Sequence, residues 1–322
     1  MNKKIITGQK IRKIQSEYSY LVSFIILVLI ALYFNHSFLS YSSIITLISN
    51  ATITGVIACG MTLVIIAGMI DLSVGSIVAL TAGLGILVLN RTGSIVLCIL
   101  FCLGMGLVLG FINGVLTAYA GMAAFIATLA TQCAYRSVIT QIGQGGPFSV
   151  DRGILKSFSK IATGKLFGSL PVLVIFLFAA ALLTWVLLTK TKFGCYVFAT
   201  GSNEHAAILS GIDVRKVKLA IMGYVGLLCG LSSVLLASRM SSVTASNAGS
   251  GYELDCIAAV AIGGTPMSGG RGKIIGTFLG ALMMQMISTI LIAAKIDPFL
   301  TGLVKGIIII VAVIFQKDGR NA

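Results

Sequence analysis

One carboxylate within an otherwise apolar stretch is the residue whose chemistry most needs explaining. Asp71 follows a long apolar run and is followed at once by Ser73 and Gly75. An ionisable side chain at the centre of a bilayer costs about 2.5–3.5 kcal/mol, so it normally faces protein or water. Asp71 therefore has two interpretations. It caps a half-helix that begins at Leu72, or it contacts a solute or a proton on a transport pathway.

Two further acids, Glu253 and Asp255, stand at the start of a short apolar element, 254–264. Residues two apart lie on different faces of a helix, which argues against a catalytic device made of paired carboxylates. We therefore interpret them as capping groups for the short element, or as contacts for a partner outside it.

A glycine-rich stretch, 263–273, follows and invites a phosphate-binding interpretation. A Walker A loop needs a glycine, four residues and then Gly-Lys-Ser/Thr. Met267 stands where the first glycine should be and Ile274 follows Lys273, so the motif fails. The seven cysteines contain no CxxC pair and the two histidines lie far apart, so no metal site is expected. The sequence thus predicts no cofactor in this chain and no catalytic residue.

Few other polar residues lie inside the apolar runs, and they stand alone in the sequence. Asn113 lies between glycines at helical spacing, where a hydrogen bond between helices is its default role. Glycines spaced four apart, as in Gly106 and Gly110, predict helices whose backbones approach closely. The isolated polar residues are Asn50, Asn113, Gln132, Gln285 and Lys305.

The elements that hold these residues must lie in a membrane. Of the 322 residues, 57% are hydrophobic and 10% are charged, whereas a soluble domain is about 25% charged; the mean hydropathy is +1.04. The net charge of +14 arises from basic residues clustered between apolar runs, where they meet lipid headgroups, so no nucleic-acid partner is expected.

The apolar runs predict the fold class. It is an all-α integral membrane protein of about ten transmembrane helices, with broken or short helices near Asp71 and at 254–264. The predicted segments are 20–36, 43–59, 60–90 with a break near Asp71, 94–118, 123–141, 169–190, 217–240, 254–264, 273–294 and 298–316.

Basic residues set the predicted orientation. Residues 1–19 carry five Lys or Arg and residues 190–218 carry another five, so both are predicted to be cytoplasmic. The chain then divides into a cytoplasmic N-terminal segment 1–19, a single transmembrane domain 20–316 and a cytoplasmic tail 317–322. The basic loop 136–168 falls outside by this count, against the rule.

One segment, 191–216, is too polar to span a membrane. Asn203 is predicted to cap a short helix that runs to about Leu209, with Gly211 just past its end. This predicts a small amphipathic helix at about 200–211 on the cytoplasmic face. It either docks a partner or is a plain surface helix.

Several motifs, in order over residues 20–316, carry a resemblance to one family. They are 60–66 with 70–76, then parts of 193–212, then 251–260 with the glycine-rich 263–272. Together they resemble the ABC-importer permeases for monosaccharides of the ribose, xylose, arabinose and galactose type. In two departures, Met69 replaces a usual glycine, and 122–124 replaces a Leu-Pro-Pro-like turn before Phe125. A sugar relative, a polyol and a signalling furanone therefore stay open as solutes.

The resemblance implies a permease subunit, in the bacterial cytoplasmic (inner) membrane, that forms the pathway for a monosaccharide or related small polar solute. It implies a second permease copy (identical or paralogous), a separate ABC ATPase pair that carries the ATP and Mg, an external sugar-binding protein and surrounding lipid, with both termini cytoplasmic. ATPase coupling is expected at Gly201, Ser202, Asn203, Glu204, Ala206, Ala207, Ser210 and Gly211. The pathway or gate is expected at Asp71, Ser73, Gly75, Asn113, Phe125, Glu253, Asp255, Gly263 and Gly264.

The main alternative is an ion-coupled secondary transporter, which would use Asp71 as its coupling residue and need no ATPase. A membrane-embedded transferase is a more distant alternative. It would want clustered acids or a metal site, and the sequence shows neither.

Overall fold

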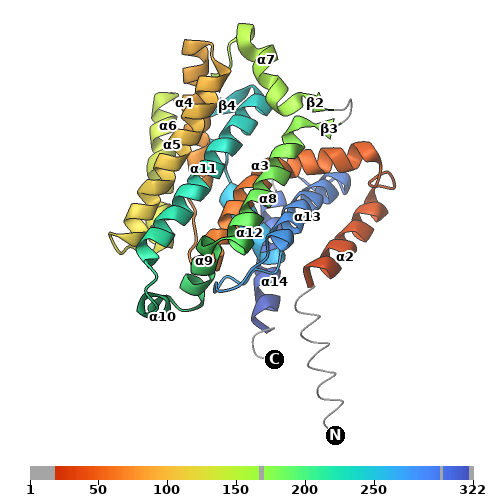
Figure 1. Ribbon diagram of the computed structural model, residues 1–322. Coiled ribbons are helices and arrows are strands. Elements are labelled where there is room, and N and C mark those ends of the chain that lie inside the picture. Colours follow the sequence, from red (N-terminus) through yellow and green to blue (C-terminus); the bar gives the residue numbers. More distant parts are fainter. Residues whose placement is uncertain (1–18, 167–169, 298–299, 319–322) are drawn as a thin grey trace.

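The computed structural model describes residues 19–166, 170–297 and 300–318, and these residues form a bundle of helices with four very short strands (Figure 1). Strand β1 (Pro147–Ser149) pairs antiparallel with β4 (Ser242–Thr244), and β2 (Lys165–Leu166) with β3 (Leu170–Pro171). The helices are α2 (Ser19–Phe34), α3 (Tyr41–Ile66), α4 (Val74–Thr92), α5 (Ile95–Ala118), α6 (Ala124–Ile142), α7 (Arg152–Thr163), α8 (Val172–Lys190), α9 (Lys192–Ser202), α10 (Glu204–Leu209), α11 (Val214–Met240), α12 (Tyr252–Ile262), α13 (Ile274–Ala293) and α14 (Thr301–Asp318).

The helices have the length and composition of a membrane protein. Among the described residues, six helices are long and apolar enough to cross a bilayer, namely α3, α4, α5, α8, α11 and α13. The all-α membrane fold is therefore confirmed, whereas the predicted count of about ten transmembrane helices is not. Helices α4 and α11 are buried over 72% of their most apolar stretch, but α5 over only 28%. Helices α4 and α11 thus lie at the centre of the bundle, whereas most of the α5 surface is exposed in the single chain.

The chain breaks around Asp71, as predicted, but the helix before the break is longer than predicted. Helix α3 runs through the expected boundary at 59–60 and ends at Ile66. Gly68 then adopts a φ of +77°, which only glycine takes without cost, and α4 begins at Val74. The predicted short element at 254–264 is α12, with 11 residues.

Glycines bring pairs of helices into backbone contact, as their spacing predicts. A Cβ atom built on Gly106 of α5 would lie 2.3 Å from the carbonyl oxygen of Gly226 on α11, and Gly110 meets the same helix. A Cβ on Gly280 of α13 would lie 1.9 Å from the carbonyl oxygen of Ala259 on α12. Because lipid gives helices no hydrophobic reason to associate, such close approach is what holds them together.

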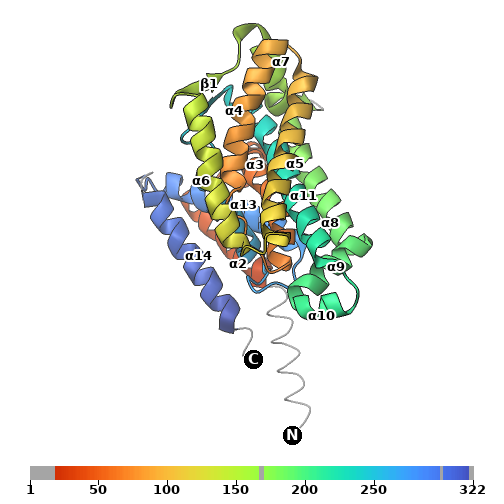
Figure 2. The same ribbon diagram turned by 90° about the vertical axis from the view of Figure 1, so that its left-hand side faces the viewer.

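Helix α10 and the described ends of the chain lie at one end of the bundle. The first turn of α2 and the last turn of α14 are near the bottom of Figures 1 and 2, as is α10, while α7 and the β1–β4 pair are at the top. The described residues nearest the two termini thus lie at the same end of the bundle as α10. The rest of the predicted N-terminal segment, 1–18, and the tail residues 319–322 lie outside the described residues.

The predicted loop 136–168 is largely structured. Arg136 lies inside α6, where its guanidinium donates to the carbonyl oxygens of Ala245 and Ala248. Helix α7 follows, with Phe158 and Ala162 buried beneath it. The basic residues of this segment thus include one half-buried hydrogen-bonding group, Arg136, and residues of the helix α7.

Candidate functional site

The short polar helix predicted near 200–211 is present, with narrower bounds. Helix α10 covers Glu204–Leu209, and the side-chain oxygen of Asn203 accepts a hydrogen bond from the backbone N–H of Ala206 at 3.0 Å. Gly211 ends the turn with a φ of +83°. Gly201 and Ser202 instead belong to the end of α9. The sequence therefore places the cap correctly and misses only the break between two consecutive helices.

Helix α10 is anchored on one side and exposed on the other. Ala207 is buried, and Glu204 accepts a hydrogen bond at 2.6 Å from Lys218 of α11. On the free side, Ile208 is 53% and Leu209 is 78% exposed. Two large apolar side chains beside charged ones at the end of a bundle form the kind of surface that binds another protein.

A groove of about 1080 Å³ lies beside α10. It is lined by residues 67–69, by the connection between α5 and α6, and by residues of 204–218. Its rim is charged: Lys216 and Asp213 form an ion pair at 3.0 Å, and the hydrogen bond from Lys216 holds the pKa of Asp213 below its ordinary value. Met69 and Met122 both line this groove.

The end of α9 touches the end of α3 with almost no space between the backbones. A Cβ built on Gly201 would lie 1.7 Å from the carbonyl oxygen of Ile66. The same oxygen accepts a hydrogen bond from the N–H of Gly270 at 2.8 Å, and Ser202 donates to the carbonyl of Gly270 at 3.4 Å. The end of α9 is thus in direct backbone contact with the turn that begins at Ile66 and leads to Asp71.

Asp71, Ser73 and Asn113 form one buried hydrogen-bonded group, which we call the Asp71 cluster. Oδ1 of Asp71 accepts from the backbone N–H of Ser73 at 2.8 Å and from its hydroxyl at 2.6 Å. Nδ2 of Asn113 donates to the same hydroxyl at 2.7 Å. The cluster joins the start of α4 to α5, as the predicted interhelical role of Asn113 requires.

The capping interpretation of Asp71 needs correction in its detail. Helix α4 begins at Val74 rather than Leu72. Asp71 accepts a hydrogen bond from the backbone N–H of Ser73, the residue before the helix, and not from an N–H of the first helical turn. Asp71 is only 1% exposed, and its second oxygen, Oδ2, makes no hydrogen bond to any residue that the structure describes. In this conformation the carboxylate is therefore closed off from solute.

The other predicted pathway residues include three glycines at packing or turn positions and one exposed aromatic side chain. A Cβ on Gly75 would lie 2.2 Å from the carbonyl oxygen of Gly249 and 2.6 Å from Oε2 of Glu253, and a Cβ on Gly263 would meet Gly276 at 2.4 Å. Gly264 supplies a turn with a φ of +87°. These glycines allow close backbone contacts. Phe125, on the first turn of α6, is 50% exposed, and Thr128, one turn further along α6, accepts a hydrogen bond from the backbone N–H of Leu72 at 3.1 Å.

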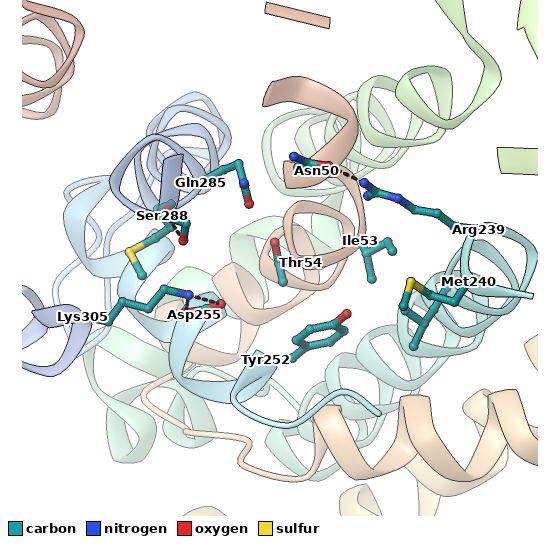
Figure 3. A pocket seen from close by; sticks show the side chains of 12 residues that line it. Asn50, Ile53, Thr54, Arg239, Met240, Tyr252, Asp255, Gln285, Ser288 and Lys305 are labelled. Atoms are coloured by element: carbon teal, nitrogen blue, oxygen red, sulfur yellow. Dashed lines mark hydrogen bonds and ion pairs between the residues drawn. The ribbon is translucent and has the colours of Figure 1, made fainter. Parts of the chain in front are cut away.

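Asp255 belongs to a separate place, a cavity of about 290 Å³ between α3, α11, α12, α13 and α14 (Figure 3). Both its oxygens accept hydrogen bonds from Lys305 at 2.9 Å. Asn50 and Gln285, which stand alone in the sequence, also line this cavity. Arg239 is the remaining charged residue that lines this cavity. The sequence did not single it out, because a basic residue at the end of a predicted span is usually a lipid-headgroup contact.

Comparison with known proteins gives one consistent result. The family described as "Branched-chain amino acid transport system / permease component" matches residues 43–313. The ribose import permease protein RbsC of Bacillus subtilis (strain 168) is 41% identical over 292 residues, covering 91% of this chain and 90% of the relative. RbsC of Escherichia coli (strain K12) is 33% identical over 300 residues, covering 92% of each.

A third relative carries a different solute in its name. The autoinducer 2 import system permease protein LsrC of Escherichia coli O9:H4 (strain HS) is 30% identical over 304 residues, covering 94% of this chain and 87% of the relative. No solved structure matches the chain. Since the family match covers most of the chain and the relatives align over nearly their whole length, the chain belongs to the permease components of ABC import systems, as its motifs predict.

Proposed function

We propose that this permease subunit conducts a monosaccharide, or a closely related small polar solute, through the bacterial cytoplasmic membrane. The observation that carries the proposal is the match to two ribose import permeases, 41% and 33% identical over more than nine-tenths of the chain. Alignments that cover more than nine-tenths of the chain include every helix from α3 to α13. The similarity therefore concerns the whole transport domain rather than one motif.

The subunit acts in an assembly with a second permease copy, an ABC ATPase pair that holds the ATP and Mg, and an external sugar-binding protein. Two features support the need for an ATPase. The sequence lacks a Walker A loop, and α10 presents Ile208 and Leu209 beside an open groove. The ATPase docks at α10 and fills this groove, whose charged rim at Asp213 and Lys216 fixes its orientation.

The end of the bundle that carries α10 faces the cytoplasm, and both chain termini lie on that side. Basic residues are concentrated in 190–218, which surrounds α10, and short basic segments stay on the cytoplasmic side of a membrane. The described ends of α2 and α14 lie at the same end of the bundle, which supports this placement (Figure 2).

ATP-driven closure of the ATPase pair moves α10, and the contacts of α9 carry the movement to the Asp71 cluster. The route runs from Gly201 through the carbonyl of Ile66 and the turn 67–69. Because backbone atoms are in contact along this route, little of the displacement is absorbed by side chains. The glycine contacts between α5 and α11 and between α12 and α13 then let these helices slide, and the pathway opens alternately to each side.

The solute is tested with the permease reconstituted in vesicles together with its ATPase and binding protein. Uptake of labelled ribose, xylose and galactose is compared with that of autoinducer 2. Saturable uptake of at least one monosaccharide is expected. Uptake of autoinducer 2 alone would reassign the solute to the class named for the LsrC relative.

The docking role is tested by changing α9 and α10. Glu204→Lys combined with Gly201→Pro removes the tie to Lys218 and breaks the end of α9, so transport should stop while membrane insertion persists. Gly104→Ala is the matched control, because a Cβ there meets nothing within 4 Å. Undiminished uptake by the double variant would refute the docking role of this segment.

A further inference from the structure

The cavity around Asp255 lies far from α10, toward the opposite half of the bundle. It is lined by Arg239 and Met240 in the last turn of α11, whereas α10 adjoins the first turn of that helix at Val214. At 1.5 Å per residue these two turns are about 37 Å apart along the axis. With α10 at the cytoplasmic end, the cavity therefore lies toward the outer side, from which an imported solute arrives. We call it the outer cavity.

The polar side chains of the outer cavity have unused hydrogen-bonding capacity. Among the described residues, the amide of Gln285 and the hydroxyl of Tyr252 have no hydrogen-bond partner, and neither has the NH₂ group of Asn50. Ser288 donates only to a carbonyl of its own helix, at 3.2 Å, and keeps its lone pairs. In Figure 3 the labelled side chains of Gln285, Ser288, Thr54 and Tyr252 surround the space between the helices.

The charged groups of the outer cavity are already engaged. Lys305 and Asp255 neutralise each other at 2.9 Å, and both side chains are about one-fifth exposed, at 22% and 23%. Arg239 donates to the carbonyl of Ser49 at 3.1 Å and to Asn50. An ion pair and a guanidinium inside a membrane domain are costly unless they face water or a ligand.

We propose that the outer cavity is a subsite for one neutral, hydroxyl-rich ring, a monosaccharide, formed within a single permease protomer. Its volume of about 290 Å³ is near the lower end of ligand pockets, at roughly 300 Å³, which suits a single sugar ring. The free groups include both donors and acceptors, as hydroxyl groups require, whereas an anion would need donors alone. The ring of Tyr252 offers an apolar face for the C–H side of the sugar.

This inference rests on the proposed function and gives it a location. It is tested by thiol labelling in the assembled importer. Ser288→Cys places a thiol in the cavity, and Thr289→Cys places one on the next residue of α13, which does not line the cavity. Labels are counted above the background of the native thiols, of which Cys133 and Cys195 are exposed. Ribose, xylose and galactose are the protecting ligands, with gluconate as an anionic comparison.

Protection of Ser288→Cys by a neutral monosaccharide, with no protection of Thr289→Cys, is the expected result. Equal labelling with and without every monosaccharide, or protection by gluconate alone, would overturn the subsite. The two proposals fail separately. Protection without import would sustain the subsite and contradict the proposed function, whereas import without protection would do the reverse.

Transport kinetics supply a second test that does not depend on a new thiol. Gln285→Leu keeps the side-chain size and removes the free amide, so KM for the imported sugar should rise about tenfold, the loss expected for one or two hydrogen bonds. Thr289→Val, one turn away on the same helix, should leave KM within twofold. An unchanged KM in Gln285→Leu, with normal insertion and ATP hydrolysis, would contradict the subsite.

Discussion

Adding one methyl group at Gly201 should uncouple ATP hydrolysis from transport. The new Cβ would lie 1.7 Å from the carbonyl oxygen of Ile66 and 2.9 Å from the N–H nitrogen of Gly270. Both atoms are backbone, so neither can rotate away. An ordinary contact needs about 3.4 Å, so α9 must retreat by about 1.7 Å from the end of α3.

The size of the effect follows from the cost of overpacking. Extra methyl groups in a close-packed contact cost about 1–3 kcal/mol, and each 1.4 kcal/mol is a factor of about ten. The intact contact between α9 and the turn at 66–70 should therefore be populated about 5- to 150-fold less. We expect solute moved per ATP hydrolysed to fall by at least fivefold, while ATP hydrolysis itself continues.

The assay measures sugar uptake and phosphate release in the same vesicles. Gly104→Ala, in the helix α5 with nothing within 4 Å of the added Cβ, is the matched control and should behave as the unmodified chain. Gly164→Ala, whose added Cβ would lie 2.4 Å from the carbonyl oxygen of Lys160 at the end of α7, remote from α9 (Figure 1), tests whether any crowded glycine gives the same loss. An unchanged ratio in Gly201→Ala, or an equal fall in Gly164→Ala, would refute the coupling route.

Three further predictions concern single polar contacts. Asp71→Asn keeps the acceptor that holds Ser73 and removes a buried charge, so transport should stay within threefold of normal. Asp71→Ala removes the acceptor and should lose about 1–3 kcal/mol of stability in thermal unfolding. Abolished transport in Asp71→Asn with intact folding would mean that the charge itself contacts solute or proton. Asn203→Ala should cost about 1 kcal/mol of stability in the capping of α10 and speed hydrogen exchange of the α10 amides several-fold, whereas Asn203→Asp should change neither. Equal exchange rates in the two variants would contradict the cap. Asp255→Asn should cost about 1–3 kcal/mol by leaving Lys305 unpaired, and adding Lys305→Met should recover most of it; additive losses in the double-mutant cycle would contradict the pairing.

The membrane fold could be read from the sequence because apolar runs of about 20 residues have few other uses. The true end of the helix that was predicted to stop between the segments 43–59 and 60–90 could not be read from the sequence. Nothing between Cys59 and Gly60 interrupts the apolar pattern, and α3 continues to Ile66. What ends it is the left-handed turn at Gly68, one of 37 glycines, most of which have other roles.

The capped helix at 204–209 was predictable because its signals are local. Asn203 and Gly211 lie at the two ends of a short polar stretch, and capping chemistry acts over three or four residues. The prediction that Asp71 acts on the helix after it was nearly right for the same reason. Asn113, which donates to the hydroxyl of Ser73 rather than to Asp71 itself, is 40 residues from Ser73 in sequence, and only the packing of α4 on α5 brings it into the group.

The outer cavity was beyond sequence reasoning, although most of its polar residues were noticed singly. Asn50, Gln285 and Lys305 come from three different helices, and Asp255 from a fourth. Their spacing in the chain carries no sign that they converge. Asp255 was grouped with Glu253 as a neighbour, yet Asp255 pairs with Lys305, whereas Oε1 of Glu253 accepts a hydrogen bond from the side-chain amide of Gln132 on α6 at 3.4 Å.

The central claim is that this chain moves a sugar only with energy received from an ATPase docked at α10. Vesicles containing the permease, with and without the ATPase, give the most direct test when sugar uptake is measured with internal ATP and with an uncoupler. Uptake should require both the ATPase and ATP and should be unaffected by the uncoupler. Uptake that proceeds without the ATPase and collapses with the uncoupler would contradict the account and favour an ion-coupled transporter.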